Sequence, residues 1–279
     1  MTTASLAAIH VYPVKALAGR GLDSAEVEPW GIAGDRRWLL TRPDGAKLTQ
    51  REQPRLALAS AELLPGGGLR VSAPGREPLE VEVPDPATAG LFTVEVWRDT
   101  VEAVPAAEEA GAWFSAYLGT EVRLVHMDAP ERRRPVDPAY SRPGETVSFA
   151  DGYPLLVTTT ASLDALNSLI AQGDHADDGP LPMNRFRPSV VITGTAPWEE
   201  DTWRRVRVGE LTFRVAKPCG RCVVTTTDQG TAERGKEPLR TLARHRRFGD
   251  QLVFGQNLIP EHSGRVRSGD SFEVLERQG

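Results

Sequence analysis

The sequence contains little cysteine and no long apolar run. Two cysteines in 279 residues are too few for a disulfide framework. No stretch approaches the roughly 18 to 20 apolar residues of a membrane-spanning helix. Residues 1–10 also lack the charged and apolar regions of a signal peptide. These absences predict a cytoplasmic protein with no membrane partner, whose closely spaced cysteines serve chemistry rather than cross-linking.

An excess of positive charge is missing as well. The chain has 33 Lys and Arg residues against 38 Asp and Glu residues, a formal net charge of -5. This balance gives no overall electrostatic reason to bind a nucleic acid, so we expect no such partner. A short basic run, residues 132–134, stands among prolines, which is typical of a solvated loop. The alternative is a rim that steers anions.

Short extended segments dominate the first hundred residues. Turn signals such as Pro43-Asp44-Gly45 and Pro65-Gly66-Gly67-Gly68 separate them, and little helix is expected between them. The pattern predicts a β-barrel-like domain over residues 1–104. The expected strands cover residues 6–14, 24–28, 38–41, 56–63, 69–72, 79–83 and 93–104.

The second domain, residues 105–279, mixes helices with a larger share of strands. Residues 106–118 and 237–245 are expected to be helical, and so are residues 161–170, where leucine recurs every three residues and Thr160 or Ser162 can cap the start. Residues 172–182 have the composition of a surface loop. The expected strands are 190–193, 203–208, 211–216, 223–227 and 271–275. The fold class predicted for the chain is therefore strand-dominated α+β.

The segment Lys217-Pro218-Cys219-Gly220-Arg221-Cys222 brings two thiols and a guanidinium together. A thioredoxin-like site would need Cys219 at a helix N-terminus, whereas both flanks are expected to be extended. A structural zinc site needs four ligands, and the histidines that could complete it, His245 and His262, have unsuitable spacing. Two buried, idle cysteines are a third interpretation. The fourth is a single thiolate ligand for a metal held by an organic cofactor, with Arg221 favouring the thiolate.

Such a cofactor, with a phosphate and a polar ring system, needs cations and hydrogen-bond donors from several strands. Candidates occur in Tyr12-Pro13-Val14-Lys15, in Gly34-Asp35-Arg36-Arg37-Trp38 and in Asn184-Arg185-Phe186-Arg187-Pro188. A single Lys or Arg is usually a solvated charge, so each segment alone carries little weight.

Together these segments resemble a known family. In order along the chain, Tyr12-Pro13-Val14-Lys15, Gly34-Asp35-Arg36, Gln50-Arg51, Phe186-Arg187-Pro188, Cys219-Gly220-Arg221-Cys222 and Phe254-Gly255-Gln256-Asn257 are similar to proteins with a MOSC N-terminal β-barrel followed by a MOSC domain. The likeness covers nearly the whole chain. It is nearest to the mitochondrial amidoxime-reducing components and the bacterial YcbX group.

The resemblance implies a molybdenum cofactor and assigns residues to it. Cys222 would be the protein ligand to molybdenum and Cys219 a neighbour that need not coordinate. Lys15, Arg36 and Arg187 would contact the pterin or its phosphate, as cations around a dianion do. Asp151 stands where the family has a residue near the metal, and it would orient a metal-bound water or the substrate there; the alternative is an ordinary turn aspartate before Gly152.

The chain departs from relatives at two positions and lacks one module. Ala16 stands where several relatives have a serine, and Ser189 stands where an asparagine is common, so one phosphate donor and one pterin donor are either missing or supplied by other residues. We also expect no membrane anchor before Leu6, and no cysteines remain for the iron–sulfur domain of some bacterial relatives.

The function that the resemblance implies is a molybdenum-dependent oxidoreductase that reduces N-hydroxylated or N-oxide compounds. With no flavin, nicotinamide or iron–sulfur motif in view, its electrons must come from a separate electron-donor protein. The alternative is a molybdenum cofactor carrier, or a sulfur-transfer and maturation protein, without redox turnover, because the fold is shared with such proteins. A structural protein with an empty site is the third possibility, and metal analysis distinguishes it.

Overall fold

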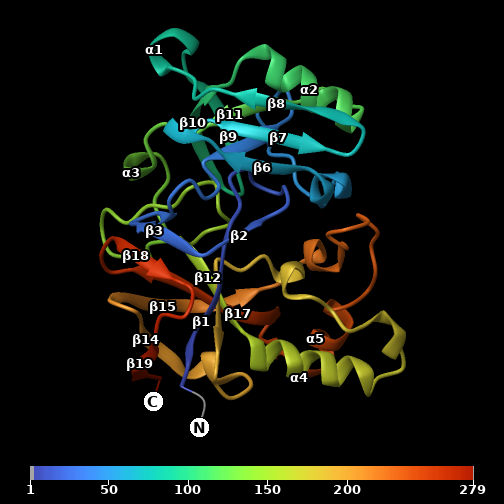
Figure 1. Ribbon diagram of the computed structural model, residues 1–279, viewed down its shortest axis with the longest axis vertical. Helices are drawn as coiled ribbons and strands as arrows, with labels where there is room; N and C mark the ends of the chain where they lie inside the picture. Colours follow the sequence, from blue (N-terminus) through green and yellow to red (C-terminus); the bar gives the residue numbers. More distant parts are fainter. Residues whose placement is uncertain (1–2, 279) are drawn as a thin grey trace.

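The computed structural model describes residues 3–278 and consists of two β-rich halves stacked along the long axis of the molecule. The upper half in Figure 1 is built from residues of the first half of the chain, and the lower half mainly from the second. Both termini lie at the lower end, because the first strand, β1 (Ser5–Val11), belongs to the lower half. The first strand and the last strand, β19 (Phe272–Arg277), belong to the same sheet.

The lower half contains a nine-stranded sheet among the residues that the structure describes. β1 pairs antiparallel with β13 (Val190–Thr193) and with β2 (Arg20–Leu22), so the N-terminal strands form one edge of this sheet. The remaining strands are β12 (Leu155–Thr159), β14 (Trp203–Val208), β15 (Leu211–Gly220), β16 (Arg247–Phe248), β17 (Gln251–Pro260) and β19 (Phe272–Arg277). Buried residues such as Trp203, Phe213 and Ile192 pack in the core of this sheet.

The upper half contains two smaller sheets and one long helix. The helix α2 (Glu108–Leu118) places Trp113, Phe114 and Leu118 in a core shared with Trp38. One sheet consists of β5 (Trp38–Thr41), β11 (Arg123–His126), β10 (Asp99–Pro105) and β9 (Phe92–Val96), and the other of β6 (Ser60–Leu63), β7 (Leu69–Ala73) and β8 (Arg76–Val81). The short helices α1 (Pro86–Ala89) and α3 (Pro130–Arg133) lie at the margin of the upper half.

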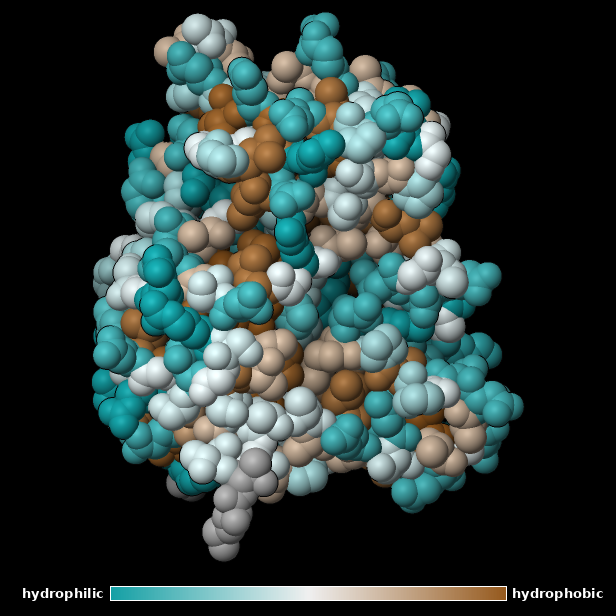
Figure 2. All heavy atoms as spheres, viewed as in Figure 1, coloured by the Kyte–Doolittle hydropathy of each residue, from teal (hydrophilic) through white to brown (hydrophobic). Residues whose placement is uncertain are grey.

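A small fourth sheet joins a segment near the start of the chain to one near its end. β18 (Gly264–Arg267) pairs with β3 (Ser24–Glu28), which also pairs with β4 (Gly31–Ile32). On the opposite side of the lower half, α4 (Thr160–Ala171) and α5 (Leu239–His245) cover a core in which Phe186 stacks on Phe254 with ring centroids 3.8 Å apart. Figure 2 shows that the viewed face is largely polar, with a narrow apolar strip down its middle.

The strand-dominated α+β class and the N-terminal barrel-type domain are confirmed. The domain boundary between residues 104 and 105 stays a prediction. Strands expected at 24–28, 38–41, 190–193 and 203–208 have the expected bounds, and the three expected helices are present. No helix within residues 3–278 has the length and apolarity that crossing a bilayer requires.

Several local expectations were wrong. Residues 93–104 form a hairpin of two strands, and residues 56–58 belong to the 3-10 turn η1 (Pro54–Leu58). The cap of α4 is Thr159, whose side chain accepts a hydrogen bond from the Ser162 N–H. Residues 223–226 form the 3-10 turn η6 (Val223–Thr226) rather than a strand, because the hydroxyls of Thr225 and Thr226 bond to carbonyls three residues back.

Candidate functional site

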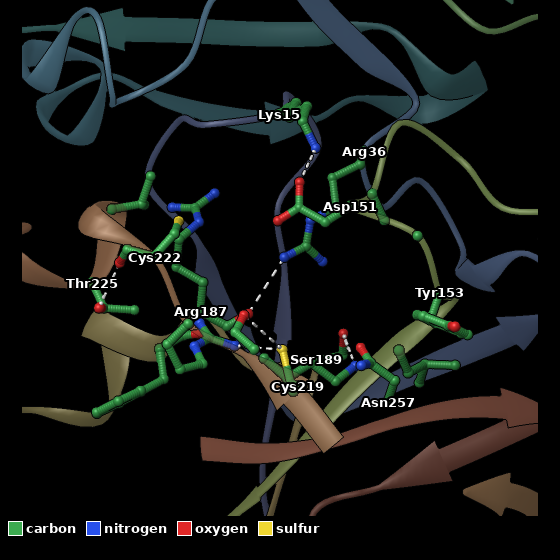
Figure 3. Close-up of a pocket in the computed structure, with 18 of the residues that line it drawn as sticks. Lys15, Arg36, Asp151, Tyr153, Arg187, Ser189, Cys219, Cys222, Thr225 and Asn257 are labelled. Carbon is green, nitrogen blue, oxygen red and sulfur yellow. Dashed lines mark hydrogen bonds and ion pairs between the residues drawn. The ribbon is translucent and has the colours of Figure 1, made fainter. Parts of the chain in front are cut away.

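A cavity of about 300 Å³ opens between the two halves of the molecule. Every residue that the sequence analysis selected for the site lines it: Lys15, Arg36, Asp151, Arg187 and Cys222. Figure 3 shows these side chains converging from segments that are far apart in the sequence. The structure therefore brings together the cations and the thiol that the motifs suggested, along with Cys219.

Two arginines of this cavity are held side by side by one tyrosine. The guanidinium carbons of Arg36 and Arg187 lie 4.3 Å and 4.4 Å from the centroid of the Tyr12 ring. Asp35, which is buried, accepts a hydrogen bond from the Tyr12 N–H at 2.8 Å and pairs with Arg36 at 2.5 Å. Burial raises the pKa of Asp35, and the charge of Arg36 opposes this.

Arg187 differs from Arg36 because it lacks a comparable partner. It follows the turn η4 (Met183–Phe186) in a left-handed conformation with φ 53°. Its Nη1 atom is buried without a hydrogen-bond partner. Burial, together with a smaller effect of the neighbouring charge of Arg36, lowers the pKa of Arg187 to about 10. A buried, unpartnered donor of this kind indicates a place for an acceptor that the protein itself does not supply.

Lys15 and Asp151 form an ion pair at the wall of the cavity. The Lys15 Nζ atom donates to the Asp151 Oδ1 atom at 2.6 Å and to the carbonyl of Phe149 at 2.7 Å. Burial lowers the pKa of Lys15 to about 8 although Asp151 opposes this. Enclosure by itself raises the pKa of Asp151, but the charge and hydrogen bond of Lys15 lower it well below its usual range. Asp151 is therefore ionised, and 76% of its side chain is exposed to the open cavity.

Arg134 fixes the segment that carries Asp151. Its side chain is 3% exposed, pairs with Asp99 at 2.7 Å and donates to the carbonyls of Ser148, Ala150 and Asp151. The expectation of a solvated loop for the basic run was therefore wrong at this position. It was also wrong at Arg133, which is 9% exposed and pairs with acidic groups. Composition alone did not predict that Arg133 and Arg134 are buried, because each pairs with an acidic residue that is distant in the sequence.

The two thiols lie at the end of β15. Cys222 directly precedes η6, whose first turn is closed by hydrogen bonds from the N–H and hydroxyl of Thr225 to the Cys222 carbonyl, at 3.0 Å and 2.8 Å. Both cysteines are free thiols. In the part of the chain described, no three His, Cys, Asp or Glu side chains gather into a metal-binding group.

Each thiol has its own guanidinium. Arg221 donates to the Cys219 Sγ atom at 2.7 Å and to the Phe186 carbonyl at 2.7 Å, so it contacts the first cysteine of the motif. Burial raises the pKa of Cys219, whereas the charge of Arg221 opposes the rise. Burial by itself lowers the pKa of Arg51, but its interaction with Cys222 raises that pKa above its ordinary value. The cation that interacts with Cys222 is therefore Arg51. Arg221, although it directly precedes Cys222 in the sequence, contacts Cys219 instead.

Sequence reasoning also missed Trp97, which lines the cavity from the hairpin between β9 and β10. No sequence signal identified it, because residues 93–104 were expected to be one continuous strand. Ala16 and Ser189, the two departures from the family pattern, both line the cavity. The Ala16 carbonyl accepts a hydrogen bond from Gln50, and the Ser189 hydroxyl accepts one from the Leu156 N–H.

Comparison with known proteins identifies two domain models and several relatives. The MOSC N-terminal beta barrel domain matches residues 3–121, and the MOSC domain matches residues 144–273. The human mitochondrial amidoxime-reducing component 1 is 30% identical, over 97% of this chain and 83% of its own length. Its mouse counterpart is 31% identical, over 97% of this chain and 82% of its own length. A molybdenum cofactor sulfurase from rice is 31% identical over 90% of this chain, which corresponds to 32% of the sulfurase.

Proposed function

The chain belongs to the family of proteins that join a MOSC N-terminal beta barrel domain to a MOSC domain, and on this basis we propose that it binds a molybdenum cofactor and reduces N-hydroxylated or N-oxide compounds. The observation that carries the proposal is the convergence of Lys15, Arg36 and Arg187 on the cavity that holds Cys222. The relatives whose names refer to amidoxime reduction support the reaction type.

The cavity suits a phosphate-bearing cofactor. Arg187 and Arg36 present two guanidinium groups, and the buried Nη1 atom of Arg187 has no acceptor within the protein. A phosphate dianion supplies acceptors of the kind that this cluster lacks, and guanidinium groups bind it with charge-assisted hydrogen bonds. In the proposal, Lys15, Arg36 and Arg187 hold the pterin and its phosphate, and the Cys222 thiolate is the protein ligand of the metal.

The reaction consumes electrons that no group of this chain stores. An N–O bond of the substrate breaks, two electrons and two protons are taken up, and the oxygen leaves as water. When bound, the cofactor supplies a metal centre that exchanges electrons in the required number. The electrons originate in a separate electron-donor protein, because the sequence contains no flavin, nicotinamide or iron–sulfur motif.

The chain's own residues orient the substrate. Asp151 is ionised and exposed to the cavity, so its carboxylate accepts hydrogen bonds from substrate N–H or O–H groups. Arg134 fixes the segment that carries Asp151 by donating hydrogen bonds to three of its backbone carbonyls. Lys15 keeps a proton on Nζ at neutral pH, since its pKa of about 8 lies above that value.

The similarity to part of a molybdenum cofactor sulfurase favours a second candidate, a cofactor carrier or maturation protein. One experiment separates the two. Protein produced with molybdate is analysed for molybdenum and pterin, and its turnover of a simple amidoxime is measured with a reduced viologen dye as the electron donor. Bound cofactor with turnover supports the reductase, and bound cofactor without turnover supports the carrier. Protein without molybdenum or pterin would refute both.

A further inference from the structure

Trp97 occupies a turn position that usually excludes large side chains. Val96 pairs with Asp99, so Trp97 and Arg98 are the two loop residues of the β9–β10 hairpin. Trp97 has φ 62°, in the left-handed region. Two-residue hairpins with positive φ at the first loop position favour glycine, asparagine or aspartate there. A tryptophan held in this conformation points to a use for its side chain.

The indole of Trp97 faces the cavity and sits among charges. Its Nε1–H donates to the Asp151 Oδ1 atom at 3.3 Å, and its side chain lines the cavity although the residue is 43% exposed. The Arg51 guanidinium lies 4.5 Å and the Lys47 ammonium 4.7 Å from the ring centroid. The ring thus already holds two flexible cationic side chains of the chain itself, as expected of an electron-rich indole face.

The side of the cavity formed by Asp151 and Trp97 differs in charge from the rest of the cavity wall. Among the described residues that line it, Asp151 is the one carboxylate, whereas the other charged side chains are all cationic: Lys15, Arg36, Arg51, Arg187, Lys217 and Arg221. The Asp151 Oδ1 atom accepts from both Lys15 and Trp97, and Figure 3 shows the second carboxylate oxygen turned away from Lys15. A planar ligand that carries positive charge or several N–H donors therefore finds the cavity's one carboxylate acceptor, and an aromatic face that already binds cationic side chains, at Asp151 and Trp97.

We propose that Trp97 is a specificity-determining residue, whose indole face forms, together with the Asp151 carboxylate, a subsite for planar N–C–N groups such as amidoximes and the amidinium ions that their reduction yields. The subsite rests on the proposed function, because it names the part of the substrate that the reductase would recognise. An amidinium ion is flat and delocalised, so it stacks on an indole while its N–H groups donate to a carboxylate. On entering, it replaces Arg51 or Lys47 on the ring.

The test measures binding separately from turnover. Isothermal calorimetry on the cofactor-loaded protein compares benzamidine, a planar cation, with benzamide, which is nearly isosteric but neutral. The variants are Trp97→Ala and Trp97→Phe. Trp30→Ala is the matched control, because the Trp30 indole also donates to a carboxylate, that of Glu28 at 2.7 Å, but Trp30 does not line the cavity.

We expect Trp97→Ala to weaken benzamidine binding about tenfold, as the loss of a partly desolvated cation–π contact would. Trp97→Phe keeps an aromatic face and should lose less than about threefold. Trp30→Ala should bind as the wild type does, and Trp97→Ala should weaken the binding of benzamide less than the binding of benzamidine. With an aryl amidoxime, Trp97→Ala should raise KM more than it lowers kcat.

Two results would overturn the subsite. One is benzamidine binding that is undetectable or unchanged by Trp97→Ala, and the other is an equal loss in Trp97→Ala and Trp30→Ala. If the protein turns over amidoximes and either result is found, the reductase assignment stands and the subsite falls. If benzamidine binding depends on Trp97 but no amidoxime is reduced, the subsite stands as a binding site and the reductase assignment falls.

Discussion

Replacing Arg187 by methionine should stabilise the cofactor-free protein while weakening its hold on the cofactor. The side chain of Arg187 is charged, largely buried and lacks an acceptor at Nη1. Methionine has a similar length and no charge, so Arg187→Met removes the unsatisfied cation without opening a large cavity. Stability and binding are then expected to change in opposite directions.

The magnitude follows from the pKa of Arg187. A guanidinium pKa lowered from 12.5 to about 10 corresponds to a cost on the order of 3 kcal/mol for keeping the group charged. Because the pKa is lower in the folded state, this cost is present in full at pH 7 and disappears only as the pH rises through about 10 and above. The contact with the Tyr12 ring offsets about 0.5 to 1 kcal/mol of it. The free energy of unfolding should therefore rise by about 2 to 2.5 kcal/mol.

Arg185→Met is the matched control. Arg185 lies two residues earlier, donates to the Thr226 carbonyl at 3.0 Å and pairs with Asp228 at 2.8 Å. Its loss should lower the free energy of unfolding by about 1.5 to 3 kcal/mol while the cofactor is retained. Urea unfolding of the cofactor-free proteins and molybdenum content after dialysis measure the two effects. Equal destabilisation by both substitutions, or full retention of molybdenum by Arg187→Met, would refute this reasoning.

Three further predictions concern other residues of the site. Cys222→Ser should yield folded protein with little molybdenum, whereas Cys219→Ser should keep it; equal losses in elemental analysis, or bound zinc, would exclude the single-thiolate assignment. Cofactor affinity should fall as the pH rises above about 8, where Lys15 loses its proton, and Lys15→Arg should abolish this dependence in a titration between pH 7 and 9.5. Arg134→Met should cost about 3 kcal/mol of stability and lower kcat by moving Asp151; unchanged urea midpoint and kcat would contradict this positioning role.

Local signals in the sequence predicted many of the strands correctly. Residues 24–28 alternate, residues 190–193 are β-branched and residues 38–41 are a short apolar run, and each is a strand with those bounds. The run at 223–227 has the same composition but forms a 3-10 turn, because threonine hydroxyls can satisfy carbonyls three residues back. Composition does not distinguish these outcomes.

Pairing between distant segments was beyond the reach of local patterns. The sequence predicted a strand near the N-terminus, but not that β1 would pair with β13 at the edge of the sheet of the lower half. The same limit applies to side chains. Composition predicted that Arg134 belongs to a solvated run, whereas in the structure it pairs with Asp99, which lies 35 residues away in the sequence. The family motifs, by contrast, identified Lys15, Arg36, Arg187 and Cys222, which all line one cavity.

Backbone strain is concentrated at the same cavity. Among residues 3–278, six residues other than glycine have positive φ, and four of them line it: Ala16, Arg36, Trp97 and Arg187. Each such conformation costs about 1 to 3 kcal/mol for a residue with a side chain. In the same place the fold leaves a guanidinium nitrogen of Arg187 without an acceptor. A chain selected for stability alone would relieve both costs by small changes, so their coincidence at this cavity agrees with the proposal that it holds an anionic cofactor.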